Sequence, residues 1–70
     1  MNDNDIGIFL MINEPVFSIG NKQYSVCSPG SGFSTWSSDG TMLDFPDIQS
    51  LLDGWVIDGK PFRSIVNTLM

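Results

Sequence analysis

Seventy residues, 41% of them hydrophobic, predict one folded domain over residues 1–70, in which folding buries only about 60% of the surface that the unfolded chain exposes. One Cys and no His exclude an intramolecular disulfide and the usual zinc ligand sets, which leaves self-association to reinforce so small a core. The formal net charge is −5, and three basic residues are too few to neutralise the phosphates of a directly bound nucleic acid.

Residues 6–12 predict an N-terminal strand. Apolar side chains occupy both alternate sets of positions in this run: Ile6, Ile8, Leu10 and Ile12 form one set, and Phe9 and Met11 belong to the other. Such a pattern is typical of a strand that is buried on both faces, and Gly7 and the β-branched residues disfavour a helix. Pro15 ends the run because it donates no ladder hydrogen bond and restricts the residue before it.

Residues 16–27 predict a hairpin, and two registers remain open. A two-residue loop at Gly20-Asn21 places Phe17 opposite Tyr24. A loop at Asn21-Lys22 instead places Ile19 opposite Tyr24. Both registers set apolar side chains against apolar ones, whereas a three-residue loop would mix the two faces and is therefore excluded.

Residues 33–45 predict a second hairpin, joined to the first by a flexible Ser- and Gly-rich connector at 28–32. Asp39-Gly40 is the strongest hairpin-turn signal in the chain. If these two residues form the whole turn, Trp36 lies opposite Leu43 and Ser34 opposite Phe45, which gathers aromatic and aliphatic side chains on one face of the sheet.

The C-terminal third changes to a helical period. Apolar residues recur at i, i+3, i+4 and i+7 in two sets, Ile48, Leu51, Leu52, Trp55 and Phe62, Ile65, Val66, Leu69. We expect Asp44 to cap the first helix, Gly54 to end it, and Pro61 to open the second after a turn at Asp58-Gly59. The sequence thus predicts an α+β fold: an antiparallel β-meander of two hairpins plus an N-terminal strand, covered by two short C-terminal helices.

Catalytic groups are scarce, and we expect no enzyme activity and no cofactor. Cys27 has no His to activate it and falls at a predicted strand end, so a structural thiol is the simpler interpretation. Asp44 and Asp47 form the closest carboxylate pair near a helix start, where helix capping explains them better than acid–base chemistry or metal binding.

The acidic residues are concentrated in one segment, residues 39–58, which contains five Asp and no Lys or Arg. Large aromatic residues at element ends are common interface anchors, and Trp36 and Trp55 are candidates for either that role or a place in the core. The predicted partner-binding residues are Asp39, Asp44, Asp47, Asp53, Trp55 and Asp58.

Two classes of function fit these observations. The first is a non-catalytic protein–protein interaction module that binds a basic surface on a larger protein. A narrower form of this hypothesis is an inhibitor that imitates nucleic acid, of the kind that phages and mobile elements use. The alternative is a structural or assembly subunit that self-associates, for example as a homodimer. The longest apolar run is far below the roughly 20 residues that span a bilayer, and acidic residues stand where a secretory signal needs basic ones. We therefore expect a cytoplasmic protein.

Overall fold

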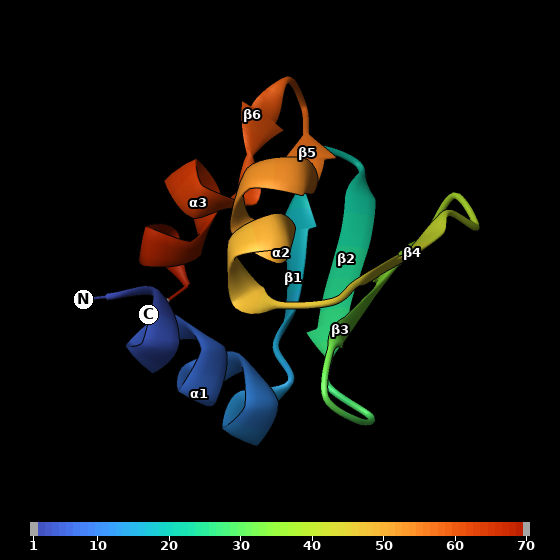
Figure 1. The fold of residues 1–70 in the computed structure, drawn as a ribbon. Coiled ribbons are helices and arrows are strands. Elements are labelled where there is room, and N and C mark those ends of the chain that lie inside the picture. The colour runs from blue at the N-terminus through green and yellow to red at the C-terminus, as the bar shows by residue number, and fades with distance from the viewer. Residues whose placement is uncertain (1, 70) are drawn as a thin grey trace.

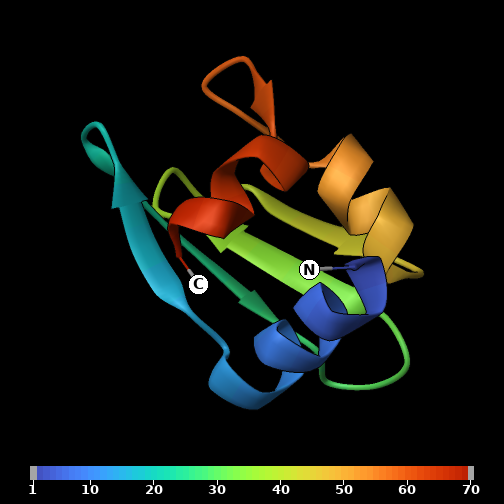
Figure 2. The same ribbon diagram turned by 90° about the vertical axis from the view of Figure 1, so that its left-hand side faces the viewer.

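The computed structural model describes residues 2–69 and has an α+β fold (Figure 1). Four strands, β1 (Val16–Ile19), β2 (Lys22–Cys27), β3 (Phe33–Ser37) and β4 (Met42–Phe45), form an antiparallel meander in the order β1-β2-β3-β4. Three helices, α1 (Asp3–Asn13), α2 (Ile48–Gly54) and α3 (Phe62–Ile65), and a 3-10 turn, η1 (Val66–Thr68), cover one face of this sheet (Figure 2). A small hairpin of β5 (Val56–Ile57) and β6 (Lys60–Pro61) connects α2 to α3.

Helix α1 occupies the segment for which the sequence predicts a strand, so that prediction is wrong. The side chain of Asn2 accepts a hydrogen bond from the N–H of Asp5 at 2.8 Å and caps the helix. Glu14 adopts a left-handed φ of 42° and donates its N–H to the carbonyl oxygen of Leu10 at 3.0 Å, which ends the helix. The two caps and the acidic first turn stabilise a helix in which apolar residues point in nearly every direction.

The first hairpin adopts one of the two predicted registers. Phe17 pairs with Tyr24 and Ile19 with Lys22, so the loop is Gly20-Asn21. Gly20 has a positive φ of 61°, the conformation that a two-residue hairpin loop requires at its first position. The two aromatic rings stack on the side of the sheet that faces the helices, with their centroids 5.6 Å apart.

The second hairpin is shifted by one residue from its predicted register. Trp36 pairs with Met42, Thr35 with Leu43, and Phe33 with Phe45. The loop holds three residues, 38–40, because the N–H of Gly40 bonds the carbonyl oxygen of Ser37 while the N–H of Ser37 bonds that of Thr41, both at 2.9 Å. Gly40, with a φ of 94°, takes the left-handed position that closes such a loop. The shift separates Trp36 from Leu43 and Phe45, which share a face with Thr35 and Phe33, and Trp36 lies on the face opposite the helices.

The C-terminal helices form at the predicted apolar repeats, with changes at their ends. Asp47, and not Asp44, caps α2 by accepting a hydrogen bond from the N–H of Ser50 at 2.8 Å. Asp44 lies within β4, so its predicted capping role is wrong. Gly54 is the last residue of α2, as predicted. The predicted turn at Asp58-Gly59 is confirmed, and it closes the small β5–β6 hairpin.

The core lies between the sheet and the three helices. Its centre is aromatic, since the Phe62 ring lies 4.7 Å from Trp55 and 5.8 Å from Phe17, centroid to centroid. Aliphatic side chains from α1, α2, η1 and the strands complete one cluster of buried residues, among them Ile6, Leu10, Val26, Leu51, Leu52, Ile57 and Val66. The Cα radius of gyration is 10.9 Å, close to the value of about 11 Å typical of a chain this long.

Candidate interaction surface

The six residues predicted for partner binding fall into two groups. Three of them lie in or near β4: Asp39 is in the loop before the strand, Asp44 is within it, and Asp47 is two residues after its end. The other three, Asp53, Trp55 and Asp58, lie in the last turn of α2, in the core, and in the β5–β6 turn. The structure therefore gathers half of the predicted residues along one strand.

Asp39 orders the loop that precedes β4. Its carboxylate accepts a hydrogen bond from the backbone N–H of Thr41 at 2.9 Å and forms an ion pair with Lys22 at 3.2 Å. These contacts lower the pKa of Asp39, and the hydrogen bonds from Thr41 contribute most to the shift. The carboxylate is exposed and charged at neutral pH, and it lies near one end of the strand.

Asp47 lies at the other end of β4 and serves as the cap of α2. The backbone N–H of Ser50 donates to its carboxylate, and this bond lowers the pKa of Asp47. Capping occupies one oxygen while the residue as a whole stays exposed. Asp47 therefore retains negative charge towards solvent while it starts the helix.

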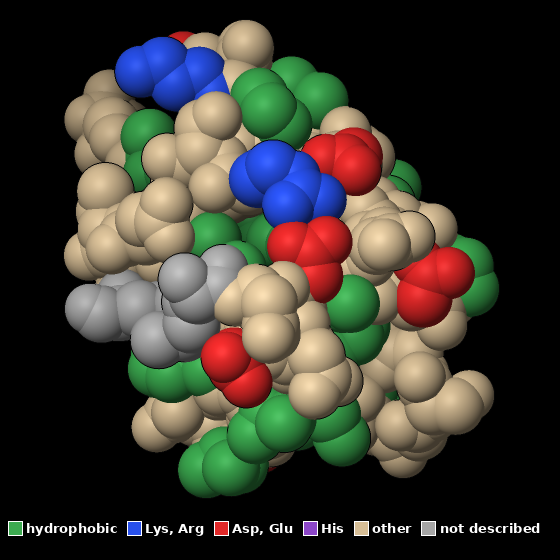
Figure 3. Space-filling model, turned by 60° about the vertical axis from the view of Figure 1, so that its left-hand side comes forward, with side chains coloured by type: hydrophobic (Ala, Val, Ile, Leu, Met, Phe, Trp, Pro, Cys, Tyr) green, Lys and Arg blue, Asp and Glu red, His purple; other side chains and the backbone are tan. Residues whose placement is uncertain are grey.

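Asp53 belongs to an ion-pair cluster on the helical side of the molecule. The Arg63 guanidinium donates from Nε to Asp53 and from Nη1 to Asp3, both at 2.8 Å. These hydrogen bonds lower the pKa of both carboxyls and raise that of Arg63. Figure 3 shows acidic and basic side chains interleaved on this side. The charge of Asp53 is thus balanced locally, which leaves it a structural role joining α1, α2 and α3.

Trp55 and Asp58 lie apart from the other predicted residues. Trp55 is only 2% exposed and packs edge-on against Phe17, so it belongs to the core and is not available to a partner. Asp58 turns the β5–β6 hairpin with a left-handed φ of 53° and lines a shallow hollow beside Ile19 and Lys22. Neither residue lies with Asp39, Asp44 and Asp47, the three residues that we call the acidic row along β4.

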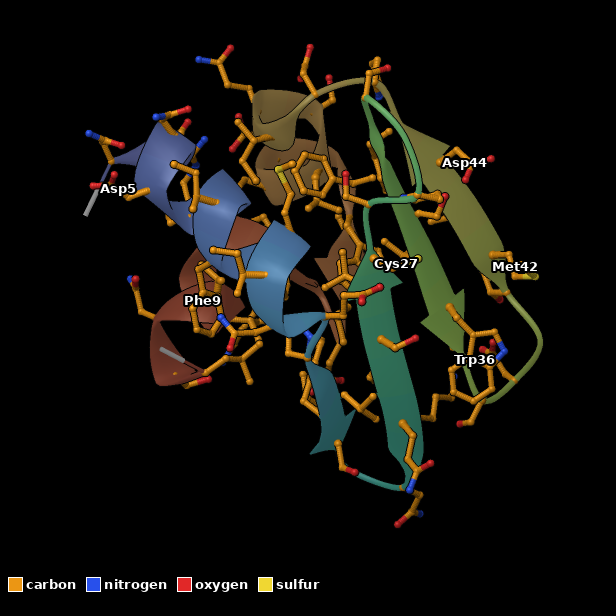
Figure 4. All side chains as sticks on the ribbon, turned by 90° about the horizontal axis from the view of Figure 1, so that it is seen from below. Asp5, Phe9, Cys27, Trp36, Met42 and Asp44 are labelled. Atoms are coloured by element: carbon orange, nitrogen blue, oxygen red, sulfur yellow. The ribbon has the colours of Figure 1, made fainter. Side chains whose placement is uncertain are left out.

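One surface of the sheet is turned away from the helices and is covered by no helix of residues 2–69; we call it the outer face. In an antiparallel sheet, residues directly opposite each other share a face. The observed pairs therefore place together Val16, Ser25, Cys27, Ser34, Trp36, Met42 and Asp44. Figure 4 shows Trp36, Met42 and Asp44 on the side of the sheet farthest from the helices.

Trp36 is the prominent apolar group of the outer face. It is 39% exposed, and its neighbour Met42 is 72% exposed. The side chain of Ser34 donates to the Asp44 carboxylate at 2.7 Å and fixes an acidic group on the same face. By contrast, Thr35, one position away, is buried on the inner face. The outer face thus combines apolar and acidic side chains that are accessible to a partner.

The sequence alone leaves Trp36 a candidate for the core or for an interface, and the two-residue turn predicted at Asp39-Gly40 places it on one face with Leu43 and Phe45. The triplet Ser38-Asp39-Gly40 also fits a three-residue loop with Gly last, and this reading gives the observed register. A one-residue change in the pairing of β3 with β4 changes which side chains of the two strands share a face. Loop length was therefore the signal that could have located the aromatic residue.

A second uncovered surface lies on α1. Ile8, Met11 and Ile12 are 48%, 53% and 74% exposed and follow the i, i+3, i+4 spacing of one helix face; we call them the α1 stripe. Apolar atoms gather on the surface at the lower end of the molecule, at the height of α1 (Figure 3). A helix that is apolar on both faces is usually covered on both.

Groups suited to catalysis or metal binding are not clustered in the part of the chain that the structure describes. Within residues 2–69, no three Cys, Asp or Glu side chains lie close enough together to hold a metal ion. Cys27 is half-buried on the outer face, at the end of β2. No helix in the same range has the length and apolar character needed to cross a membrane. Comparisons of the chain with protein-family models, curated proteins and solved structures find no match in any of the three.

Proposed function

We propose that this chain is a small, acidic, non-catalytic protein–protein interaction module that binds a basic surface of a larger protein through the outer face of its sheet. The observation that supports this function is Trp36, which is 39% exposed on a face that no helix within residues 2–69 covers. Trp, with Tyr and Arg, is enriched among the side chains that dominate binding energy.

The surroundings of Trp36 have the composition of an interface. Met42 and Val16, 72% and 70% exposed, extend the apolar area on either side, and short Ser side chains leave the indole accessible. Asp44 supplies negative charge on the same face, and the net charge of −5 gives the molecule a field that attracts a basic partner. Apolar contact then supplies affinity, while charge supplies orientation and association rate.

The narrower form of this proposal is a cytoplasmic inhibitor. A basic surface on a protein commonly serves to bind nucleic acid. A module that covers such a surface would block it without catalysing any reaction, as accessory proteins of phages and mobile elements do. Asp44 on the outer face, with Asp39 and Asp47 in the segments before and after β4, would supply the acidic charge that meets such a surface.

The test is affinity capture from lysate of the source cells, with the chain immobilised, at about 0.1 M and about 1 M salt. We expect a basic protein that is retained at low salt, released at high salt, and lost in Trp36→Ala and in Asp44→Lys. Asp5→Lys is the matched control, because Asp5 is also exposed but lies on α1, on the helical side of the sheet (Figure 4). Retention of the same proteins by both outer-face variants would refute the proposal.

The α1 stripe favours a second candidate function, that of an assembly subunit. Three exposed apolar side chains on consecutive turns can complete their burial against a second copy of the chain. Light scattering of the wild-type chain would then give the mass of a dimer, and Ile12→Lys would return the mass to that of a monomer. A wild-type monomer at high protein concentration would exclude this function.

A further inference from the structure

Strand β4 forms one edge of the four-stranded sheet (Figure 4). Hydrogen-bonded and non-bonded pairs alternate along an antiparallel ladder. The bond from the Ser37 N–H to the Thr41 carbonyl oxygen fixes this alternation, so the backbone of Leu43 and Phe45 points towards β3. The N–H and C=O groups of Met42 and Asp44 consequently point outwards from the sheet.

The side chain of Leu43 is the apolar feature of this edge. It lies on the inner face, where its partner Thr35 is 3% exposed, yet Leu43 itself is 41% exposed. The helices therefore leave the Leu43 part of the last strand uncovered, although α2 packs against Phe45 at the end of the same strand. β4 also contains no Pro or Lys, the residues that commonly protect an edge from further pairing. The edge thus offers both backbone groups and an apolar side chain to an additional strand.

The charges along β4 indicate what kind of strand fits. Asp39, Asp44 and Asp47 lie before, within and after it, whereas the three basic residues of the chain are at positions 22, 60 and 63. Lys22 already pairs with Asp39 and Arg63 with Asp53. A second copy of the chain would bring two such acidic rows together, which is unfavourable. A basic segment would instead place unlike charges side by side.

From these observations, we infer that β4 pairs with an extended segment of the partner in which basic and apolar residues alternate. The basic residues lie beside Asp44 on the outer face, the apolar residues cover Leu43 on the inner face, and the backbone bonds Met42 and Asp44. This mode of binding, in which a peptide adds a strand to a sheet, takes affinity from main-chain hydrogen bonds and specificity from alternate side chains. The inference rests on the proposed function for the basic character of its partner.

The experiment uses the full chain, labelled with ¹⁵N, and a synthetic peptide of about eight alternating lysine and valine residues, a length typical of strands. Amide hydrogen exchange is followed by NMR with and without the peptide. We expect about tenfold slower exchange at Met42 and Asp44, and smaller changes at Leu43 and Phe45, whose amides the ladder already protects. A peptide with glutamate in place of lysine, and one with N-methylated amides, are expected to leave exchange unchanged.

A pair of variants separates the backbone from the side chain. Met42→Pro removes an N–H that the sheet does not use, whereas Met42→Ala keeps it. We expect the proline variant to lose the exchange protection of Asp44 and the alanine variant to retain it. Unchanged exchange at Met42 and Asp44 with the lysine–valine peptide would overturn the inference. It would also be overturned if both amides were already protected in a free chain that has the mass of a dimer.

The two proposals fail in distinguishable ways. If a lysate protein is lost in Trp36→Ala but retained by Met42→Pro, the outer face binds the partner and strand addition is refuted. If the peptide protects Met42 and Asp44 while outer-face variants capture the same lysate proteins as the wild type, β4 accepts a basic strand and the proposed function is refuted.

Discussion

Leu52 provides a direct test of how α2 packs on the sheet. Its side chain is completely buried in the core, and replacing it with Ala removes about three methylene equivalents. At roughly 0.8 kcal/mol for each, the transfer term alone is about 2.4 kcal/mol, and the residual cavity brings the expected loss to about 2 to 5 kcal/mol. A domain of this size has a total stability of about 4 to 10 kcal/mol, so the variant loses a large part of it.

The assay is urea unfolding followed by tryptophan fluorescence, because buried Trp55 reports on the core. Ile12→Ala is the matched control: its side chain is also aliphatic and helical but 74% exposed, so its expected effect is below about 0.5 kcal/mol. In thermal unfolding, a loss of about 2 kcal/mol lowers Tm by roughly 8 to 16 °C. A loss below about 1 kcal/mol for Leu52→Ala, or equal losses for the two variants, would refute the packing argument.

Two further predictions concern the ends of α1. Arg63 lowers the pKa of Asp3 and of Asp53, so the stability they contribute is present above their unfolded value of about 3.9 and is lost as the pH falls through the lower folded values. In urea unfolding below pH 4, the free energy of unfolding of Arg63→Met should fall less steeply with pH than that of the wild type. An equally steep fall in both proteins would contradict this prediction. Glu14→Gly removes the strain of a left-handed φ of 42° and should stabilise the fold by about 1 kcal/mol. Glu14→Ala is the control, and an equal gain from it would assign the effect to charge.

Strand pairing was the most predictable part of the fold, because hairpins are specified by short turns and local alternation. Gly20-Asn21 and Asp39-Gly40 both lie in observed loops. The register of the second hairpin was not predictable from Asp39-Gly40 alone, since two- and three-residue loops both accept Gly at this position. Gly32 shows a constraint that no local pattern reveals, because a Cβ there would lie 2.5 Å from the carbonyl oxygen of Phe45.

Helix α1 was mispredicted because its apolar residues surround the axis and leave no clear helical period. Its ends carried the information instead: Asn2 is a favourable cap, acidic residues follow it, and Pro15 stands just beyond the last turn. For the candidate site, the acidic residues around β4 were within reach of the sequence, whereas the exposure of Trp36 required the correct loop length of the second hairpin as well. That exposure depends on how the helices, which come from both ends of the chain, share one face of the sheet.

The order of the strands also bears on how the chain folds. Each strand of the meander pairs with its neighbour in sequence, so the sheet can form by closing loops of only a few residues. The Arg63–Asp3 pair spans 60 residues and joins the two ends of the chain. Closing so long a loop costs more entropy than forming any hairpin. We therefore expect α1 to dock late in folding and to open first in the native state, before the hydrogen-bonded amides of the sheet exchange.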